Sequence, residues 1–315
     1  MIPFRRMHRW ALAVSLALVA CGVKATNLGG QNRFDIDADP VALLPGSAVI
    51  VANIDARAVF GNSAVGPELA AIAQKLVPLA ESAGFDGSRD IDRILVASFA
   101  TGGVDLAAVL SGRFDSAKMA AATSGPNGAP ILRGLYAGRA RYAVGSVQYA
   151  LLTSKTLVAG TAEGLRRVLD RVQSGVLDRS LSPWMVDAIE TKGSAIAAAA
   201  DFQTQPIASA TVGSVHLGWL DGLRLARLAA DFEAPGLNVA ATLTYGDPQK
   251  ALAGADGERS FGGLLKTFGP LLGGVSFQTF DVTSDGKDLQ TKLSVDDSSL
   301  RTLVSFVPRF LPKSP

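Results

Sequence analysis

The 315-residue sequence contains one cysteine, Cys21, and two histidines, His8 and His216. Aromatic residues make up only 7% of the chain, whereas hydrophobic residues together make up 48%. We therefore expect a substantial core built from small and branched aliphatic side chains. Neither G-x-x-x-x-G-K nor G-x-G-x-x-G occurs. Because these are the common phosphate-loop and dinucleotide-binding signatures, we predict no cofactor.

Basic charge is concentrated at the N-terminus. Arg5, Arg6 and Arg9 precede an apolar run, Trp10 to Ala20. This order is typical of an export signal, and the run is shorter than the roughly 20 apolar residues that a spanning helix needs. We expect a signal peptide over residues 1–20. Without its three arginines, 27 basic residues face 28 acidic ones, a net charge of about −1, so no basic surface for nucleic acid is expected.

The segment Leu18-Val19-Ala20-Cys21-Gly22 resembles the lipobox of bacterial lipoproteins. The resemblance implies that signal peptidase recognises Leu18, Val19 and Ala20 and that Cys21 becomes an acylated N-terminus. Acyl chains of the palmitate type on Cys21 would then hold the protein in the membrane. Gly22, in place of Asp, implies delivery to the outer membrane, on its periplasmic face. The alternatives are an ordinary signal peptide that happens to contain a cysteine, or a short membrane anchor.

If acylation consumes Cys21 and His8 leaves with the signal, the mature chain keeps His216 and no free thiol. This excludes a Cys/His zinc site and a Cys-His nucleophilic pair, and we predict no metal site. Ser214 lies two residues before His216, but no third group or nucleophile elbow accompanies them. We interpret His216 as an ordinary histidine and predict no catalytic residue.

Two clusters of like charge also favour structural interpretations. Asp35, Asp37 and Asp39 are spaced like the start of a calcium loop, but Pro40 stands where such a loop needs glycine. We interpret them as part of a solvated acidic tether. The basic cluster lies in residues 166–171, where we expect a solvated helix face rather than a phosphate site; it comprises Arg166, Arg167 and Arg171.

The polarity of the sequence divides the chain after the signal peptide into a tether and a folded body. Residues 21–40 are polar and lack apolar periodicity, so we predict a flexible tether from lipidated Cys21. The string "GSAVIVANID" at 46–55 is similar to "GSAIAAAADF" at 193–202, and each indicates a buried strand. We therefore divide the body into two diverged α+β modules, 41–182 and 183–315.

Apolar spacing and turn residues predict the elements within each module. We expect hairpins over 91–114, 223–245 and 275–295, with several short strands over 131–160. Helices are predicted over 65–84, 116–122, 162–173 and 297–310, and from Asp247 toward Leu272, where glycines 253–263 interrupt the pattern.

Grouped strands joined by hairpins favour an α+β fold, with two diverged repeats of mostly antiparallel sheet and helices on one face. The strings "LLPGSAVIVANID", "RDIDRILVASF", "LSGRFD" and "LTYGDPQKA" are similar to those of bacterial envelope proteins built from duplicated α+β modules. The resemblance implies a fold type and no activity.

Three functions stay open. The first is a membrane-anchored envelope lipoprotein that acts without catalysis, by binding or scaffolding an envelope protein or lipid partner. The second is a periplasmic carrier or chaperone for lipid or another apolar ligand, which needs an apolar cavity. The third is a carboxylate-based hydrolase, because 28 acidic residues are present and their pairing in space is not visible in a sequence.

Overall fold

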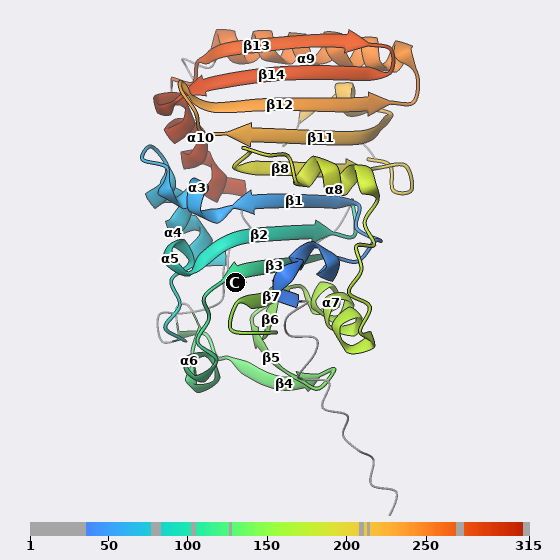
Figure 1. The fold of residues 1–315 in the computed structure, drawn as a ribbon. Helices are drawn as coiled ribbons and strands as arrows, with labels where there is room; N and C mark the ends of the chain where they lie inside the picture. The colour runs from blue at the N-terminus through green and yellow to red at the C-terminus, as the bar shows by residue number, and fades with distance from the viewer. Residues whose placement is uncertain are drawn as a thin grey trace, which may run out of the picture.

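The computed structural model describes residues 36–76, 83–101, 105–125, 128–207, 211–212, 215–268 and 274–310. The expected signal peptide, Leu18, Val19, Ala20 and Cys21 lie outside these ranges. Twelve strands form one antiparallel sheet in the order β13-β14-β12-β11-β8-β1-β2-β3-β7-β6-β5-β4 (Figure 1). The predicted α+β class with a mostly antiparallel sheet is confirmed.

The strands of this sheet are β1 (Ile50–Asp55), β2 (Ile91–Ser98), β3 (Leu106–Gly112), β4 (Leu132–Tyr136), β5 (Arg139–Val144), β6 (Val147–Leu151), β7 (Thr156–Gly160), β8 (Ile196–Asp201), β11 (Leu223–Asp231), β12 (Gly236–Tyr245), β13 (Phe277–Asp285) and β14 (Asp288–Asp296). The helices are α3 (Ala56–Gly61), α4 (Gly66–Leu76), α5 (Gly87–Asp90), α6 (Ser116–Ala121), α7 (Ala162–Ser174), α8 (Pro183–Ile189), α9 (Pro248–Phe268) and α10 (Asp297–Phe310). Two short strands, β9 (Thr211–Val212) and β10 (Val215–His216), pair separately.

The two similar strings of the sequence become neighbouring strands at the middle of the sheet. β1 pairs with β8 in antiparallel register, with Ile54 opposite Ile196 and Ile50 opposite Ala200. Outward from this pair the order is β1-β2-β3-β7-β6 on one side and β8-β11-β12-β14-β13 on the other. The hairpin β4–β5 extends the first side only. Both expected modules therefore contribute to one continuous sheet.

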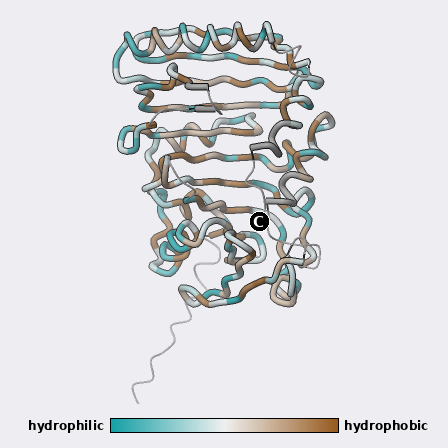
Figure 2. The backbone as a smooth tube through the Cα atoms, turned by 180° about the vertical axis from the view of Figure 1, so that it is seen from behind, coloured by the Kyte–Doolittle hydropathy of each residue, from teal (hydrophilic) through white to brown (hydrophobic). Residues whose placement is uncertain are grey.

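Helices cover both faces of the sheet, where cover on one face was expected. On one face, α7 and α8 pack on β1, β2, β3 and β7 through a core that includes Val51, Leu95 and Leu169. On the other face, α6 and the segment around Phe85 pack against Leu110 and Leu157. Adjacent residues of β3 and β7 are apolar, so both faces have to be covered. Figure 2 shows the sheet from behind, with α9 along its β13 end.

Turn residues, capping residues and apolar spacing in the sequence predicted most helices and strands correctly. The hairpins β2–β3, β11–β12 and β13–β14 all form. Gly286 has a φ of 58° in the turn that joins β13 to β14, a conformation that glycine adopts readily. Asp115 and Thr161 accept hydrogen bonds from backbone N–H groups at the starts of α6 and α7, as expected of capping residues. The predicted helix 65–84 is described as α4 to Leu76.

The glycines of residues 253–263 do not interrupt α9, which is continuous from Pro248 to Phe268. These glycines let the helix approach aromatic side chains closely. A Cβ on Gly257 would meet the Cβ of Trp219, and a Cβ on Gly262 would meet the ring of Phe280. The low helix propensity of glycine is therefore outweighed by packing.

The folded part begins earlier than the predicted Val41. Ile36 is 1% exposed and belongs to the core under α7. The Asp37 carboxylate accepts hydrogen bonds from the hydroxyls of Thr153 (2.6 Å) and Thr156 (2.7 Å) at the turn between β6 and β7. Residues 36–40 are thus part of the body, and the expected acidic tether does not include them.

No helix within the described ranges is long and apolar enough to span a membrane.

Candidate functional site

One face of the sheet is left open in its second half. Along β11, β12, β14 and β13, alternate side chains point to the face opposite α9. The exposed ones include Arg227, Ala240, Gln290, Lys292, Asp281 and Thr283. Their neighbours Leu289, Thr291 and Val282 are buried on the α9 side. Within the described residues, no helix covers this face of β12, β14 or β13 (Figure 1). We call it the open face.

A hollow forms on the open face because two small residues lie opposite each other. Ala229 of β11 pairs with Ala240 of β12, while longer side chains surround them. The cavity above has a volume of about 430 Å³ and is also lined by Arg227, Thr242 and Gln290. A second cavity of about 490 Å³ adjoins it, sharing Ala229, Ala240 and Lys292. We call the two together the open-face groove.

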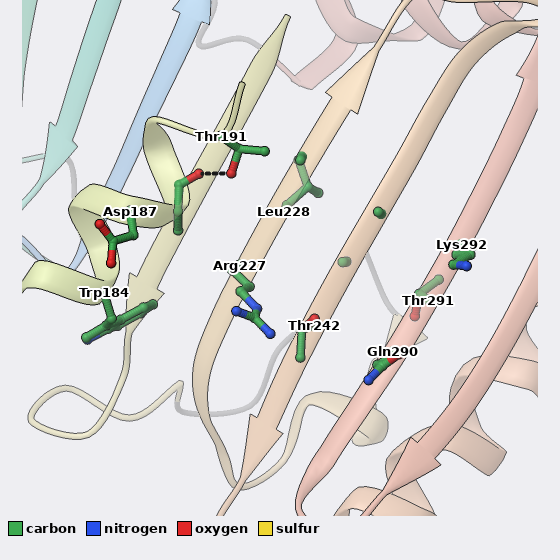
Figure 3. A pocket seen from close by; sticks show the side chains of 13 residues that line it. Trp184, Asp187, Thr191, Arg227, Leu228, Thr242, Gln290, Thr291 and Lys292 are labelled. Atoms are coloured by element: carbon green, nitrogen blue, oxygen red, sulfur yellow. Dashed lines mark hydrogen bonds between the residues drawn. The ribbon is translucent and has the colours of Figure 1, made fainter. Parts of the chain in front are cut away.

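Helix α8 forms the wall of this groove next to β8. Its residues Met185, Val186 and Ile189 are buried in the core. The Asn53 side-chain amide donates a 2.8 Å hydrogen bond to the carbonyl of Ile189 and fixes the end of the helix on β1. The opposite stripe of the helix then borders the hollow (Figure 3); it comprises Trp184, Asp187 and Ala188, with Thr191 just beyond the helix end.

The groove contains both cations and acids, the acids being Asp187, Asp231 and Glu233. Within the part of the chain that the structure describes, neither Arg227 nor Lys292 has a hydrogen bond or an ion pair. Lys292 lies opposite Ala240, and Arg227 lies two residues before Ala229, so the two cations flank the alanine floor diagonally. Their N–H groups, with the Gln290 amide and the Thr242 hydroxyl, can donate to an acceptor group of a ligand.

Thr291, between Gln290 and Lys292 on β14, points away from the groove and contacts a buried acid on the α9 side of the sheet. The Thr291 hydroxyl hydrogen-bonds to both carboxyl oxygens of Glu258 on α9, at 2.9 and 3.0 Å. Burial raises the pKa of the Glu258 carboxyl above its ordinary value, while the bond from Thr291 acts in the opposite direction. The nearby Tyr245 hydroxyl donates to the carbonyl of Trp219. Glu258 therefore helps to hold α9 against β14, and it does not line the groove.

The basic cluster of α7 does not form a solvated face. Arg167 pairs with Asp105 at 3.2 Å and lies over the ring of Phe99. Arg171 is 15% exposed and donates to the carbonyls of Ala42 and Asp178. Only Arg166, paired with Glu163, fits the expectation of an exposed residue. The cluster holds α7 to neighbouring segments.

The two described acids of the expected tether, Asp37 and Asp39, are also structural, and Asp35 lies outside the described residues. Asp39 forms a bidentate ion pair with Arg179, which also contacts Glu190 at 2.9 Å. These two carboxylates raise the pKa of Arg179. The network joins the N-terminal segment to the chain before and after α8.

The other residues considered from the sequence are less informative. His216 ends β10, and Ser214 lies outside the described residues. The described residues contain no group of three His, Cys, Asp or Glu side chains that could hold a metal ion.

The groove residues were not singled out from the sequence, although a signal for them exists. Alternate positions of β11, β12 and β14 carry polar residues, as in Arg227 and Asp231 or Gln290 and Lys292. That alternation indicates strands with one solvated face. It does not indicate that these three strands lie side by side.

Comparisons with known proteins bear on the fold only. No protein-family model matches the chain, and no curated protein matches it. Among solved structures, crystal forms I and IV of TP0453 are similar at 11% identity, with TM-scores of 0.52 and 0.51. They cover 85% and 87% of this chain and 97% and 99% of their own. The likeness extends over most of the chain and supports the α+β fold.

Proposed function

We propose that the protein is a bacterial envelope lipoprotein, held in the membrane by acyl chains on Cys21, that acts without catalysis by binding a partner in the open-face groove. The lipobox supports the anchor. The observation that carries the binding role is the pair of exposed cations, Arg227 and Lys292, without partners in the described protein. By the sorting rule for Gly22, the protein acts on the periplasmic face of the outer membrane.

The chemistry of the groove favours a polar partner. Its floor is alanine and its walls carry Arg, Lys, Gln, Asn, Thr, Asp and Glu side chains, with Trp184 as the aromatic surface. A ligand with an acidic or other acceptor group beside a flat apolar part fits this set. The open face measures about 20 Å by 30 Å from strand spacing and length. That area approaches one side of a standard protein interface, about 800 Å².

The two alternatives receive less support. A lipid carrier needs a largely apolar cavity, whereas both cavities of the groove are bordered by charged side chains. A carboxylate-based hydrolase needs two acids flanking the scissile bond. The cavity beside α8 is lined by one acid, Asp187, and the adjoining cavity by Asp231 and Glu233, of which Asp231 is occupied by hydrogen bonds from the Asn238 side chain and the Glu233 N–H. The same geometry suits binding without bond cleavage.

The anchor is tested by metabolic labelling with a palmitate analogue. The wild-type protein should incorporate label and fractionate with membranes, because Cys21 is the proposed acylation site. The Cys21→Ala variant should lose the label. Equal labelling of the two proteins would contradict the lipoprotein assignment.

The groove is tested by capture from detergent-solubilised envelopes, with mass spectrometry of bound proteins, glycans and lipids. The Arg227→Ala/Lys292→Ala variant should lose a component that wild type retains, since both cations are exposed and removable without unfolding. Lys250→Ala/Lys287→Ala removes the same charge from exposed positions outside the groove and should retain it. Identical capture by all three proteins would rule out a groove partner.

A further inference from the structure

The β4–β5 hairpin exposes apolar side chains at one edge of the sheet. β4 is the last strand in the sheet order, so one side of its backbone is unpaired. Leu132 and Leu135 on this strand are 67% and 79% exposed, the highest values among the exposed large hydrophobic residues of the described chain. Edge strands with large apolar residues promote association unless something covers them. We therefore expect another molecule or surface to cover the β4 edge of the hairpin.

The same end of the sheet is strongly basic. The segment from residue 113 to 155, which contains α6 and strands β4 to β6, carries six Arg and Lys residues and one acid. They are Arg113, Lys118, Arg133, Arg139, Arg141 and Lys155, with Asp115. At the other end, residues 277–296 carry four Asp and two Lys. The long axis of the sheet thus runs from a basic edge to an acidic one.

Acids lie near part of this basic charge, as Asp90 does near Arg113, whereas two arginines of the β4–β5 hairpin contact neutral acceptors. Arg133 donates to the carbonyls of Ala120 and Ala122, both at 2.7 Å. Arg141 donates to the side-chain oxygen of Gln148. Because these acceptors are neutral, they orient the guanidinium groups and do not compensate their positive charge. Lys118 does have an acidic neighbour, Asp115, at 3.8 Å.

The N-terminal segment enters the fold at this basic end. Asp37 is bonded to Thr153 and Thr156, on either side of the turn between β6 and β7. The chain from Cys21 to Ile36 can span at most about 50 Å. The twelve strands extend about 50 Å across the sheet at about 4.8 Å per strand. A membrane anchor at Cys21 therefore joins the body at the β6–β7 turn, which is nearer to the β4 edge of the sheet than to the β13 edge.

We infer that the basic end of the sheet docks on an anionic lipid surface, with Leu132 and Leu135 in the headgroup layer and the Arg and Lys side chains against lipid phosphates. This inference rests on the proposed anchor for its orientation. Leu132 and Leu135 are three residues apart on β4, so they point to opposite faces of the sheet. A lipid surface that meets the unpaired β4 edge end-on contacts both leucines, and its charge complements the basic side chains. Docking leaves the open-face groove turned away from the membrane.

The test is vesicle co-sedimentation of the unacylated chain that starts at residue 22, which keeps every described residue. Vesicles contain either phosphatidylcholine alone or phosphatidylcholine with 30% phosphatidylglycerol. The chain should bind the anionic vesicles only, and 0.5 M NaCl should release it. Lys118→Ala/Lys155→Ala should weaken binding about 25-fold, at about fivefold per cation near the surface. Leu132→Ser/Leu135→Ser should also weaken it at least tenfold.

Matched controls alter similar residues elsewhere. Leu252→Ser/Leu264→Ser replaces two leucines of α9 that are 46% and 56% exposed, and Lys250→Ala/Lys287→Ala removes two other exposed lysines. Both should bind like the parent chain, and circular dichroism should show every variant folded. Three results would each overturn the inference: no binding by the parent chain, equal binding by the hairpin variants, or a dimer that Leu132→Ser/Leu135→Ser converts to monomer. Since no acyl chain is present, failure here leaves the labelling test of Cys21 unaffected.

Discussion

Several charged residues of this protein make structural contacts that the neighbouring sequence does not predict. Asp37 and Asp39 are in a polar stretch, yet one bonds to two threonines and the other to Arg179. Arg171 is spaced like a surface residue but reaches the carbonyl of Ala42, 129 positions away. Sequence reasoning could not find these partners, because it places charges on a helix face and does not place the segment that covers it.

Glu258 gives a prediction at this scale. Burial raises its pKa in the folded state, so the folded protein binds the proton more tightly than the unfolded chain does. The stability that this proton contributes is complete below the ordinary value of 4.5 and is lost as pH rises through the higher folded-state pKa. Urea unfolding should therefore show Glu258→Gln gaining stability relative to wild type as pH increases. A difference between the two proteins that stays constant from pH 4 to pH 8 would contradict this.

Elements were predicted well where the determining signal is local. Hairpins β2–β3 and β13–β14 follow from turn residues, and α7 from its cap and apolar stripe. Helix α9 was the difficult case, because its glycines lower local propensity while the aromatic residues that they accommodate, such as Trp219 and Phe280, lie on other elements. Packing determined its length, and packing partners are not visible in a local window.

Substitutions at two adjacent glycines of α9, Gly262 and Gly263, separate the effect of packing from the effect of helix propensity. A methyl group on Gly262 would collide with the ring of Phe280, so Gly262→Ala should lower the free energy of unfolding by about 1–3 kcal/mol. A methyl group on Gly263 meets nothing within 4 Å, so Gly263→Ala should raise it by up to about 1 kcal/mol. Urea denaturation of the two variants measures both values. Equal effects of the same sign would show that the helix does not approach Phe280 closely.

At the scale of the whole molecule, the similarity of residues 46–55 and 193–202 indicated related halves, but not that their strands pair. Register between β1 and β8 is set by contacts far apart in sequence. The consequence is a shared core, since Val51 of the first half and Ala199 and Met185 of the second belong to one cluster. The halves should therefore unfold together.

Leu169→Ala tests this cooperativity. Leu169 is fully buried on the core-facing side of α7, so its truncation should cost about 2–5 kcal/mol. Fluorescence of Trp184 and Trp219, both in the second half, should report the same lowered urea midpoint as circular dichroism of the whole sheet. If the tryptophan transition kept its wild-type midpoint, the two halves would be independent units.

The central claim is that the open-face groove holds a partner in the envelope, and photo-crosslinking in living cells tests it most directly. A benzophenone amino acid replaces Gln290, which borders the alanine floor, or Asp256, which is exposed on α9 at the opposite face. We predict a discrete crosslinked product from position 290 and none from position 256. That product should disappear when Ala240→Leu fills the hollow. No product from position 290, or the same product from both positions, would contradict the account.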